Sequence, residues 1–319
     1  MKIVIPDDYQ GALRNLDCFA KLAGHQVTIY RDGVKDNETL ATRFQDADAL
    51  VLIRERTAIS EELLASLPNL KFISQTGRGI PHIDLEACTR HKVAVAVGGG
   101  SPYATAELTW GLILAAMRHI PLEVARLKAG HWQTTIGLGL RGRTLGIFGY
   151  GNIGSVVAAY GRAFGMHVLV WGREGSRGRA QADGFEIAID QGTLFENSDV
   201  LSLHISMKPE TRGIVSAADL AKMKSTALLV NTSRAALIEP GALEQALHNG
   251  HPGTAAVDVY EDEPVTDHPL LHLDNVICTP HLGYVEKDNY EQFFSIAFDN
   301  LLAFAAGNPI NILNADALR

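Results

Sequence analysis

The sequence predicts an α/β protein built from two doubly wound parallel sheets. The chain has 319 residues, enough for two domains of ordinary size. Short apolar runs rich in Val, Ile and Leu recur along it, as in strands that are buried on both faces of a parallel sheet. Segments with helical spacing separate these runs, which is typical of the crossover connections between parallel strands.

The expected elements follow one another as repeated strand–helix units. Strands are expected at Lys2–Ile5, Ala49–Ile53, Lys71–Ser74, Val93–Val97, Thr144–Phe148, His167–Trp171, Val200–His204, Ala227–Asn231, Thr254–Val259 and Asn275–Thr279. Helices are expected at Ser60–Ser66, Leu85–His91, Tyr103–His119, Asn152–Phe164, Ser216–Met223, Pro240–Asn249 and Asn289–Ala306. The polar stretch Gly172–Ala180, rich in Gly and Arg, is predicted to be a loop.

Composition and charge argue against several classes of protein. Lys plus Arg is 28 and Asp plus Glu is 36, a net charge of −8, which disfavours a nucleic-acid surface. The cysteines Cys18, Cys88 and Cys278 are too widely spaced for a disulfide framework or a zinc site. No apolar run has the length of a membrane span, and no signal peptide is expected at the start. We therefore expect a cytoplasmic protein with no metal, membrane or nucleic-acid partner.

The most specific local motif is GYGNIG at residues 149–154, which lies between a predicted strand and a predicted helix. Gly149 permits a tight turn, Gly151 lets the backbone approach a pyrophosphate, and Gly154 lets the helix pack closely on the strand. The helix N-terminus offers N–H groups and a partial positive charge to phosphates. The motif predicts a Rossmann-type nucleotide domain. Its expected cofactor contacts are Gly149, Tyr150, Gly151, Asn152, Ile153 and Gly154.

The late position of this motif predicts how the domains are divided. The N-terminal α/β unit precedes the motif and so is not the nucleotide domain. The glycine run Gly98–Gly100 is a flexible stop, after which Ser101 and Pro102 suit the start of a long apolar helix. We expect residues 1–100 and 286–319 to form one domain and residues 101–285 the nucleotide domain. The long apolar helix belongs either to a core or to a subunit interface.

The end of the second strand in the nucleotide domain bears on the choice of cofactor. An acidic side chain there would bind the adenosine ribose of NAD. Gly172 stands at that place instead, Arg173 follows it, and Arg177 and Arg179 are close by. A cation without a facing carboxylate suits the 2′-phosphate of NADP. NADP(H) is therefore favoured, with Arg173 as its contact, and NAD(H) with Glu174 as the ribose ligand is the alternative.

Several motifs, in order and over nearly the whole length, resemble those of the D-isomer-specific 2-hydroxyacid dehydrogenases. They are Gly77-Arg78-Gly79 with Ile83-Asp84, Thr105-Ala106-Glu107-Leu108, the GYGNIG turn, Val230-Asn231-Thr232-Ser233-Arg234, Val257-Asp258-Val259-Tyr260-Glu261-Asp262-Glu263-Pro264 and Thr279-Pro280-His281-Leu282-Gly283. The resemblance implies a Rossmann-type domain inserted in a flavodoxin-like substrate domain. It implies a homodimeric NAD(P)-dependent oxidoreductase that interconverts a small 2-keto acid and its D-2-hydroxy acid, with the long helix after the hinge at the dimer interface.

The resemblance places the catalytic residues at Arg234, Glu263 and His281. Arg234 and His281 each follow a predicted strand, where ligands bind in open α/β sheets. A guanidinium can clamp a substrate carboxylate and polarise the carbonyl to be reduced. An imidazole can exchange a proton with the new alkoxide, and Glu263 can hold its second ring nitrogen. Each residue alone could be a structural loop residue, and the joint order of the motifs favours catalysis.

The remaining assignments also come from the resemblance. The backbone N–H groups of the loop Gly77-Arg78-Gly79 are expected to bind the substrate carboxylate, and Arg78 adds a cation. Thr105, Thr232 and Asp258 are expected near the nicotinamide end of the cofactor. The resemblance assigns nothing to Trp132, which is either a packing residue or part of an interdomain or dimer contact, with packing favoured.

Two other functions stay open at this point. A formate- or phosphite-dehydrogenase-like enzyme would also need a clamp for a small anion, which Arg234 and Arg78 could supply. An NAD(P)H-sensing binding protein, like the corepressors built on this fold, would bind the cofactor with little turnover, and the fold alone does not exclude it. Retention of Arg234, Glu263 and His281 favours the dehydrogenase.

Overall fold

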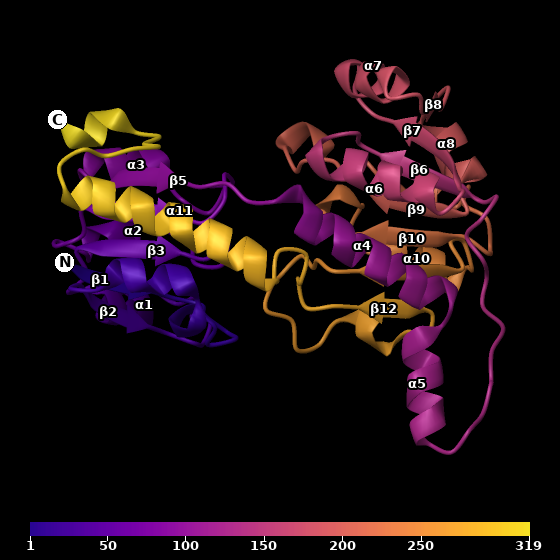
Figure 1. Cartoon of the computed structure of the whole chain (residues 1–319), viewed down its shortest axis with the longest axis horizontal. Coiled ribbons are helices and arrows are strands. Elements are labelled where there is room, and N and C mark those ends of the chain that lie inside the picture. The colour runs from indigo at the N-terminus through magenta and orange to yellow at the C-terminus, as the bar shows by residue number, and fades with distance from the viewer. The chain divides into compact units, whose positions relative to one another are not determined.

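The structure, a computed structural model, describes residues 1–319 as two compact units (Figure 1). One unit comprises Met1–Ser101 and Glu286–Arg319, and the other comprises Pro102–Val285. These bounds differ by one residue from those expected from the sequence.

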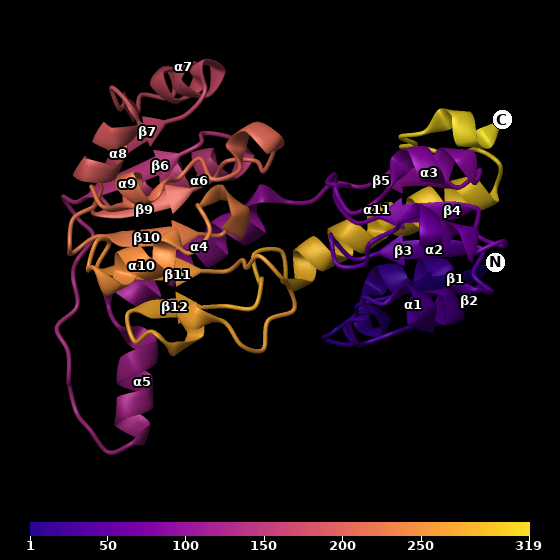
Figure 2. The same cartoon turned by 180° about the vertical axis from the view of Figure 1, so that it is seen from behind.

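The first unit is a five-stranded parallel sheet in the order β2-β1-β3-β4-β5. The strands are β1 (Lys2–Ile5), β2 (Gln26–Ile29), β3 (Ala49–Leu52), β4 (Phe72–Gln75) and β5 (Ala94–Val97). The helices are α1 (Asn37–Phe44), α2 (Glu61–Ala65), α3 (Leu85–Arg90) and α11 (Lys287–Ala305). Helix α11 covers one face of the sheet and α1–α3 cover the other, as Figures 1 and 2 both show. The C-terminal helix therefore returns to the first unit, as predicted.

The second unit is a seven-stranded parallel sheet in the order β12-β11-β10-β9-β6-β7-β8. The strands are β6 (Thr144–Phe148), β7 (His167–Trp171), β8 (Glu186–Ile187), β9 (Val200–Leu203), β10 (Leu228–Asn231), β11 (Thr254–Val257) and β12 (Val276–Cys278). The helices are α4 (Pro102–Met117), α5 (Ile120–Lys128), α6 (Asn152–Ala163), α7 (Glu174–Ala182), α8 (Gln191–Asn197), α9 (Ala217–Leu220) and α10 (Ala242–His248). Two doubly wound parallel sheets were predicted, and both are present.

The strand order reverses at β6, which pairs with β7 on one side and with β9 on the other. Ligands of doubly wound folds bind at the carboxyl ends of the strands beside such a reversal. The GYGNIG turn follows β6, and the motifs that carry Arg234, Asp258 and His281 follow β10, β11 and β12. Because all these strands are parallel, the turn and the three motifs lie along one edge of the sheet.

Two predictions of local structure were wrong. Residues 174–182 form helix α7 rather than a loop; Ala180 is its one buried residue, so the segment has no apolar periodicity to reveal it. Trp132 is 75% exposed and does not pack inside the chain. Strands β2 and β8 were also not predicted: β2 lies at a sheet edge with alternating exposure, and β8 has only two residues.

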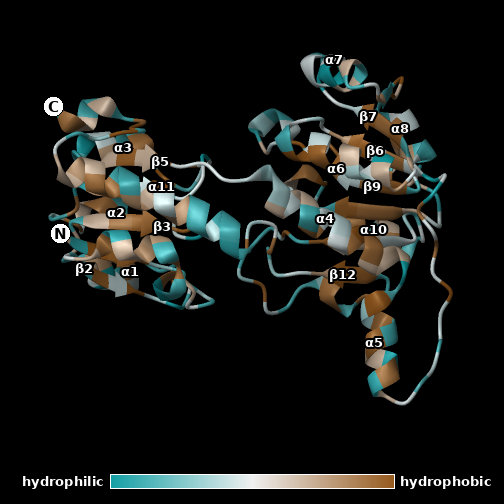
Figure 3. Ribbon diagram, viewed as in Figure 1, coloured by the Kyte–Doolittle hydropathy of each residue, from teal (hydrophilic) through white to brown (hydrophobic).

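The long apolar helix expected after the hinge belongs to a core. Pro102 is its first residue, and α4 packs on α6 with eight of its residues buried. Its exposed positions, Tyr103, Glu107 and Gly111, are spaced by four residues and so lie on one side of the helix. Exposed apolar residues follow on α5, which buries none of its residues and carries apolar positions along its length (Figure 3). No helix in the chain combines the length and apolarity that crossing a bilayer requires.

Candidate active site

The three glycines of the turn after β6 meet three different backbone demands. Gly149 has a φ of +101°, and a Cβ there would lie 2.6 Å from the carbonyl oxygen of His204. A Cβ on Gly154 would collide with the Gly149 carbonyl, because the helix packs closely on the turn. A Cβ on Gly151 would meet nothing within 4 Å, so open space lies beside its backbone. The turn therefore has the geometry of a pyrophosphate cradle.

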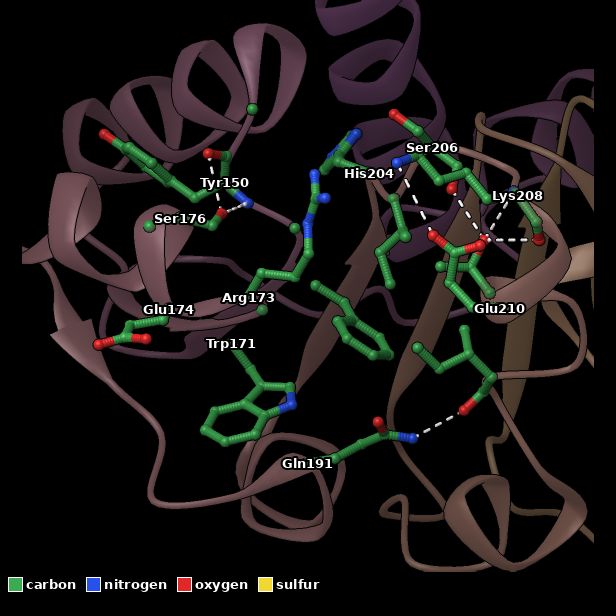
Figure 4. A pocket seen from close by; sticks show the side chains of 18 of the residues that line it. Tyr150, Trp171, Arg173, Glu174, Ser176, Gln191, His204, Ser206, Lys208 and Glu210 are labelled. Atoms are coloured by element: carbon green, nitrogen blue, oxygen red, sulfur yellow. Dashed lines mark hydrogen bonds and ion pairs between the residues drawn. The ribbon is translucent and has the colours of Figure 1, made fainter.

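A cavity of about 620 Å³ opens beside this turn (Figure 4). Its walls come from the turn, the end of β7, the start of α7 and the loop after β9. The residues with polar side chains that line it include Arg173, Glu174, Ser176, Arg179, Gln191, His204, Ser206, Lys208 and Glu210. The walls combine the glycine turn with polar side chains of both charges, which fits a dinucleotide.

Of the three arginines considered for the 2′-phosphate, Arg173 is the one that stays available to a ligand. It is exposed and lines the cavity, and its side chain makes no hydrogen bond or ion pair. Arg177 lies over the Trp171 ring, 4.7 Å from its centroid, and Arg179 donates to the Tyr150 carbonyl at 2.9 Å. In Figure 4 the Glu174 carboxylate points away from the side of the cavity that carries Lys208.

Lys208 is a cavity residue that the sequence motifs did not reveal. It lies in the loop after β9, where its Nζ is 3.7 Å from a carboxylate oxygen of Glu210. The Lys208 backbone N–H donates to Thr211 Oγ1 at 2.8 Å, which fixes the loop. Lys208 belongs to no glycine pattern or known motif. The sequence therefore gives no sign that its charge lies at the cavity, and only the fold shows it.

The His281 ring and the Glu263 carboxylate form a close pair. His281 Nδ1 lies 2.6 Å from Glu263 Oε2, and Glu263 Oε1 accepts the Tyr260 N–H at 3.0 Å. Burial alone would raise the pKa of Glu263, but the hydrogen bond and charge of His281, the Tyr260 amide and the charge of Arg234 together lower it. Glu263 is therefore an ionised acceptor that holds the orientation of the His281 ring.

Arg234 follows β10 in a loop that its neighbours hold in place. Asn231 is 1% exposed; its Nδ2 donates to the Arg234 carbonyl at 3.0 Å, and its Oδ1 accepts the Ser233 N–H at 3.0 Å. Ser233 Oγ donates to the Ile205 carbonyl at 2.7 Å, which ties this loop to the one after β9. Strands β10, β11 and β12 are consecutive in the sheet, so the loops that follow them lie side by side. The charge of Arg234 contributes to lowering the pKa of Glu263, which shows that the two side chains are near each other. The structure therefore brings Arg234, Glu263 and His281 together.

The Asp258 carboxylate is bound by the loop after β12. Its side chain is 0% exposed, and its oxygens accept the Thr279 hydroxyl at 2.6 Å, the Leu282 N–H at 2.7 Å and the Gly283 N–H at 2.8 Å. Burial raises its pKa despite these bonds. These contacts hold the loop on which His281 adopts a φ of +52°, and a contact between Asp258 and a nicotinamide stays a prediction.

Thr105 and Thr232 likewise bind the protein itself. Thr105 Oγ1 donates to the Gly283 carbonyl at 2.8 Å. The Thr109 and Thr232 hydroxyls are 2.8 Å apart, and Thr109 also donates to the Thr105 carbonyl at 2.8 Å. These bonds join helix α4 to the loops after β10 and β12, so the loops that carry Arg234 and His281 share one support.

The loop Gly77-Arg78-Gly79 lies in the first unit, at the carboxyl end of β4. Gly77 has a φ of +93°, and the Arg54 guanidinium occupies the space that a side chain at Gly77 would need. Gln75 Nε2 donates to the Arg54 carbonyl at 2.8 Å and to the Gly79 carbonyl at 3.3 Å. These two hydrogen bonds hold the loop in place. Arg78 is exposed. No group of three His, Cys, Asp or Glu in the chain is placed to hold a metal ion.

Comparisons with known proteins agree with the motifs. Residues 110–283 match the family model described as D-isomer specific 2-hydroxyacid dehydrogenase, NAD binding domain. The chain is 39% identical to a glyoxylate reductase of Aeropyrum pernix, over 88% of this chain and 87% of that protein. It is 54% identical, with a TM-score of 0.98, to the crystal structure of an oxidoreductase from Ralstonia solanacearum proposed to be a D-3-phosphoglycerate dehydrogenase, covering 100% of this chain and 98% of that chain.

A third relative is longer than this chain. A D-3-phosphoglycerate dehydrogenase of Methanocaldococcus jannaschii is 40% identical over 87% of this chain, and this chain spans 54% of its length. The similarity thus concerns about half of that protein.

Proposed function

Because the chain belongs to the D-isomer-specific 2-hydroxyacid dehydrogenase family, we propose that it interconverts a small 2-keto acid and its D-2-hydroxy acid. A nicotinamide dinucleotide, held by the turn at residues 149–154, supplies or accepts the hydride. The single observation that carries the proposal is the 2.6 Å pair of His281 and Glu263 beside Arg234, on the same sheet edge as the glycine turn. Catalytic residues and a dinucleotide cradle at one edge are what such a reaction needs.

The roles of the three residues follow from their chemistry. Arg234 binds the substrate carboxylate and polarises the carbonyl at C2, where negative charge develops during reduction. His281 carries a proton, which it gives to the oxygen at C2 as that oxygen becomes a hydroxyl. Glu263 keeps the ring in one orientation and stabilises the imidazolium from which the proton leaves. Oxidation of the hydroxy acid reverses these steps.

The substrate is best tested with the compounds that the relatives' names suggest. We propose a small 2-keto acid such as glyoxylate, and D-3-phosphoglycerate is the second compound to test. The experiment measures glyoxylate reduction with NADPH and NADH, and D-3-phosphoglycerate oxidation with NADP and NAD, through the absorbance of the reduced nicotinamide. Turnover of at least one pair supports a dehydrogenase. Tight cofactor binding with no turnover on a broad 2-keto-acid panel would instead support a sensing protein.

The cavity residues support NADP(H) as the preferred cofactor. Gly172 provides no carboxylate for the adenosine ribose, and Arg173 faces the cavity without a protein partner. A guanidinium binds a phosphate through charge-assisted hydrogen bonds that a ribose hydroxyl does not match.

Combining Gly172→Asp with Arg173→Ala is expected to shift selectivity toward NADH. The change removes a phosphate ligand and adds a ribose ligand, so the ratio of kcat/KM for NADPH to that for NADH should fall about 10–100-fold. A Cβ at Gly172 would lie 3.4 Å from Ser176 Oγ, so there is space for a side chain, but the φ of +159° is one that side chains rarely adopt; the circular dichroism spectrum must show that the double variant is folded. Arg126→Ala on α5 is the matched control and should leave the ratio unchanged. An unchanged ratio in the double variant would refute the role of Arg173.

We also propose a homodimer, with α5 rather than α4 at its interface. Ile120, Val124 and Leu127 are 49%, 47% and 57% exposed and fall on one face at helical spacing. Leu127→Glu would place a charge on this face and should convert the dimer to a monomer in sedimentation velocity, with the circular dichroism spectrum unchanged. Leu318→Glu, at an exposed apolar position outside α5, should stay dimeric. A monomeric wild type, or a dimeric Leu127→Glu variant, would contradict the assignment.

A further inference from the structure

Helix α7 lacks the apolar face by which helices usually attach to a sheet. Of its nine residues only Ala180 is buried, and the helix is polar along most of its surface (Figure 3). Surface helices ordinarily dock through a stripe of apolar side chains, and tertiary packing supplies most of their stability. The position of α7 must therefore depend on polar contacts.

Those polar contacts converge on the residue between the first two glycines of the turn. Ser176 Oγ accepts the Tyr150 N–H at 2.8 Å and donates to the Tyr150 carbonyl at 2.9 Å, as Figure 4 shows. Arg179 Nη2 donates to the same carbonyl at 2.9 Å. Ser176 and Arg179 are three positions apart on α7, so they lie on one face of the helix. Both polar groups of the Tyr150 backbone are thus bound by α7.

The Tyr150 side chain reaches the other end of the same helix. Its hydroxyl donates to Asp183 Oδ2 at 2.6 Å, and Asp183 is the C-cap of α7. The side chain is buried, and its ring lies 5.7 Å from that of Phe185. Burial and the Asp183 carboxylate raise the pKa of Tyr150, so the hydroxyl remains a donor. One residue therefore binds the first turn, the middle and the end of α7.

We propose that Tyr150, through Ser176, Arg179 and Asp183, sets cofactor selectivity by fixing the place of α7. Arg173 is the N-cap of this helix, so its position in the cavity depends on how α7 is docked. Tyr150 acts as a positioning residue, because its own polar groups bind the protein. The glycine turn and the proposed 2′-phosphate subsite are therefore held in a fixed position relative to each other. This inference rests on the NADP(H) preference proposed above.

The test compares two nucleotides that differ in the 2′-phosphate. Isothermal titration of the full-length protein gives the Kd for 2′,5′-ADP and for 5′-AMP. Wild type should bind 2′,5′-ADP more tightly. Tyr150→Phe and Ser176→Ala each remove hydrogen bonds that hold α7, so each should weaken 2′,5′-ADP binding about fivefold while 5′-AMP binding changes less than twofold. Ser176→Thr keeps the hydroxyl and should restore the wild-type value.

The outcomes separate this inference from the cofactor preference. Tyr160→Phe on α6 is the matched control and should bind both nucleotides as wild type does. If wild type prefers 2′,5′-ADP but the Tyr150 and Ser176 variants keep that preference, or lose affinity for both nucleotides equally, the positioning role is overturned and the NADP(H) preference stands. If wild type binds 5′-AMP as tightly as 2′,5′-ADP, the NADP(H) preference itself is overturned, and this inference with it.

Discussion

Replacing His281 with alanine is expected to lower kcat for reduction of the best 2-keto acid by about a thousandfold, with the Kd for NADPH unchanged. A positioned general acid contributes about 10²–10⁴-fold to such a step. His281 is the histidine whose ring is held by an ionised carboxylate beside Arg234. The measurement is steady-state turnover at saturating cofactor, combined with titration of NADPH.

Two further variants serve as comparisons for His281→Ala. Glu263→Gln keeps a hydrogen-bonding group but removes the charge that stabilises the imidazolium, so kcat should fall less, about 10–100-fold. His248→Ala removes an exposed histidine on α10 and should leave kcat unchanged. A His281→Ala variant that retains more than a tenth of wild-type kcat would exclude its role as the proton donor.

Arg234→Ala is expected to lower kcat/KM for the keto acid by about a thousandfold or more. Loss of the guanidinium removes a charge-assisted clamp on the substrate carboxylate, and it removes stabilisation of the charge that develops on the C2 oxygen. Both kcat and KM should change, because the same group acts in the ground state and in the transition state. The measurement is the full substrate dependence of turnover at saturating NADPH.

The variant Arg234→Lys tests whether the positive charge alone is sufficient. Arg234→Lys keeps the charge but not the planar fork, so it should recover part of kcat/KM and remain well below wild type. Arg126→Ala should behave as wild type. A loss of less than tenfold in Arg234→Ala would contradict the proposed clamp, and equal activity of Arg234→Lys and wild type would contradict its bidentate geometry.

The parts of this site that the sequence predicted are those that depend on local backbone demands. Gly149, Gly151 and Gly154 each meet a requirement set by a turn of a few residues, so their spacing alone carried the prediction. Strands β10 and β11 are buried on both faces and read as continuous apolar runs. Motif order then placed Arg234 and His281 after β10 and β12, the two strands that flank β11.

The parts that were missed depend on contacts between distant segments. Helix α7 is held by hydrogen bonds of Ser176 and Asp183 to Tyr150, which lies 26 and 33 positions earlier in the chain. The helix therefore has no apolar periodicity from which the sequence could predict it. The hydrogen bonds by which Asp258 holds the loop after β12 join residues 21 or more positions apart, so the sequence does not show them. Lys208 reaches the cavity because the loop after β9 lies opposite the end of β7 in the strand order.

The most direct test of the account follows the hydride itself. Wild type and the Arg234→Ala and His281→Ala variants are incubated with C4-deuterated NADPH of the transferring face and the best 2-keto acid, and the product is analysed by mass spectrometry. Wild type should place one deuterium at C2 of the hydroxy acid, and either variant should give little product. Oxidation of the nucleotide without deuterium at C2, or labelled product at the wild-type rate from the variants, would contradict the account.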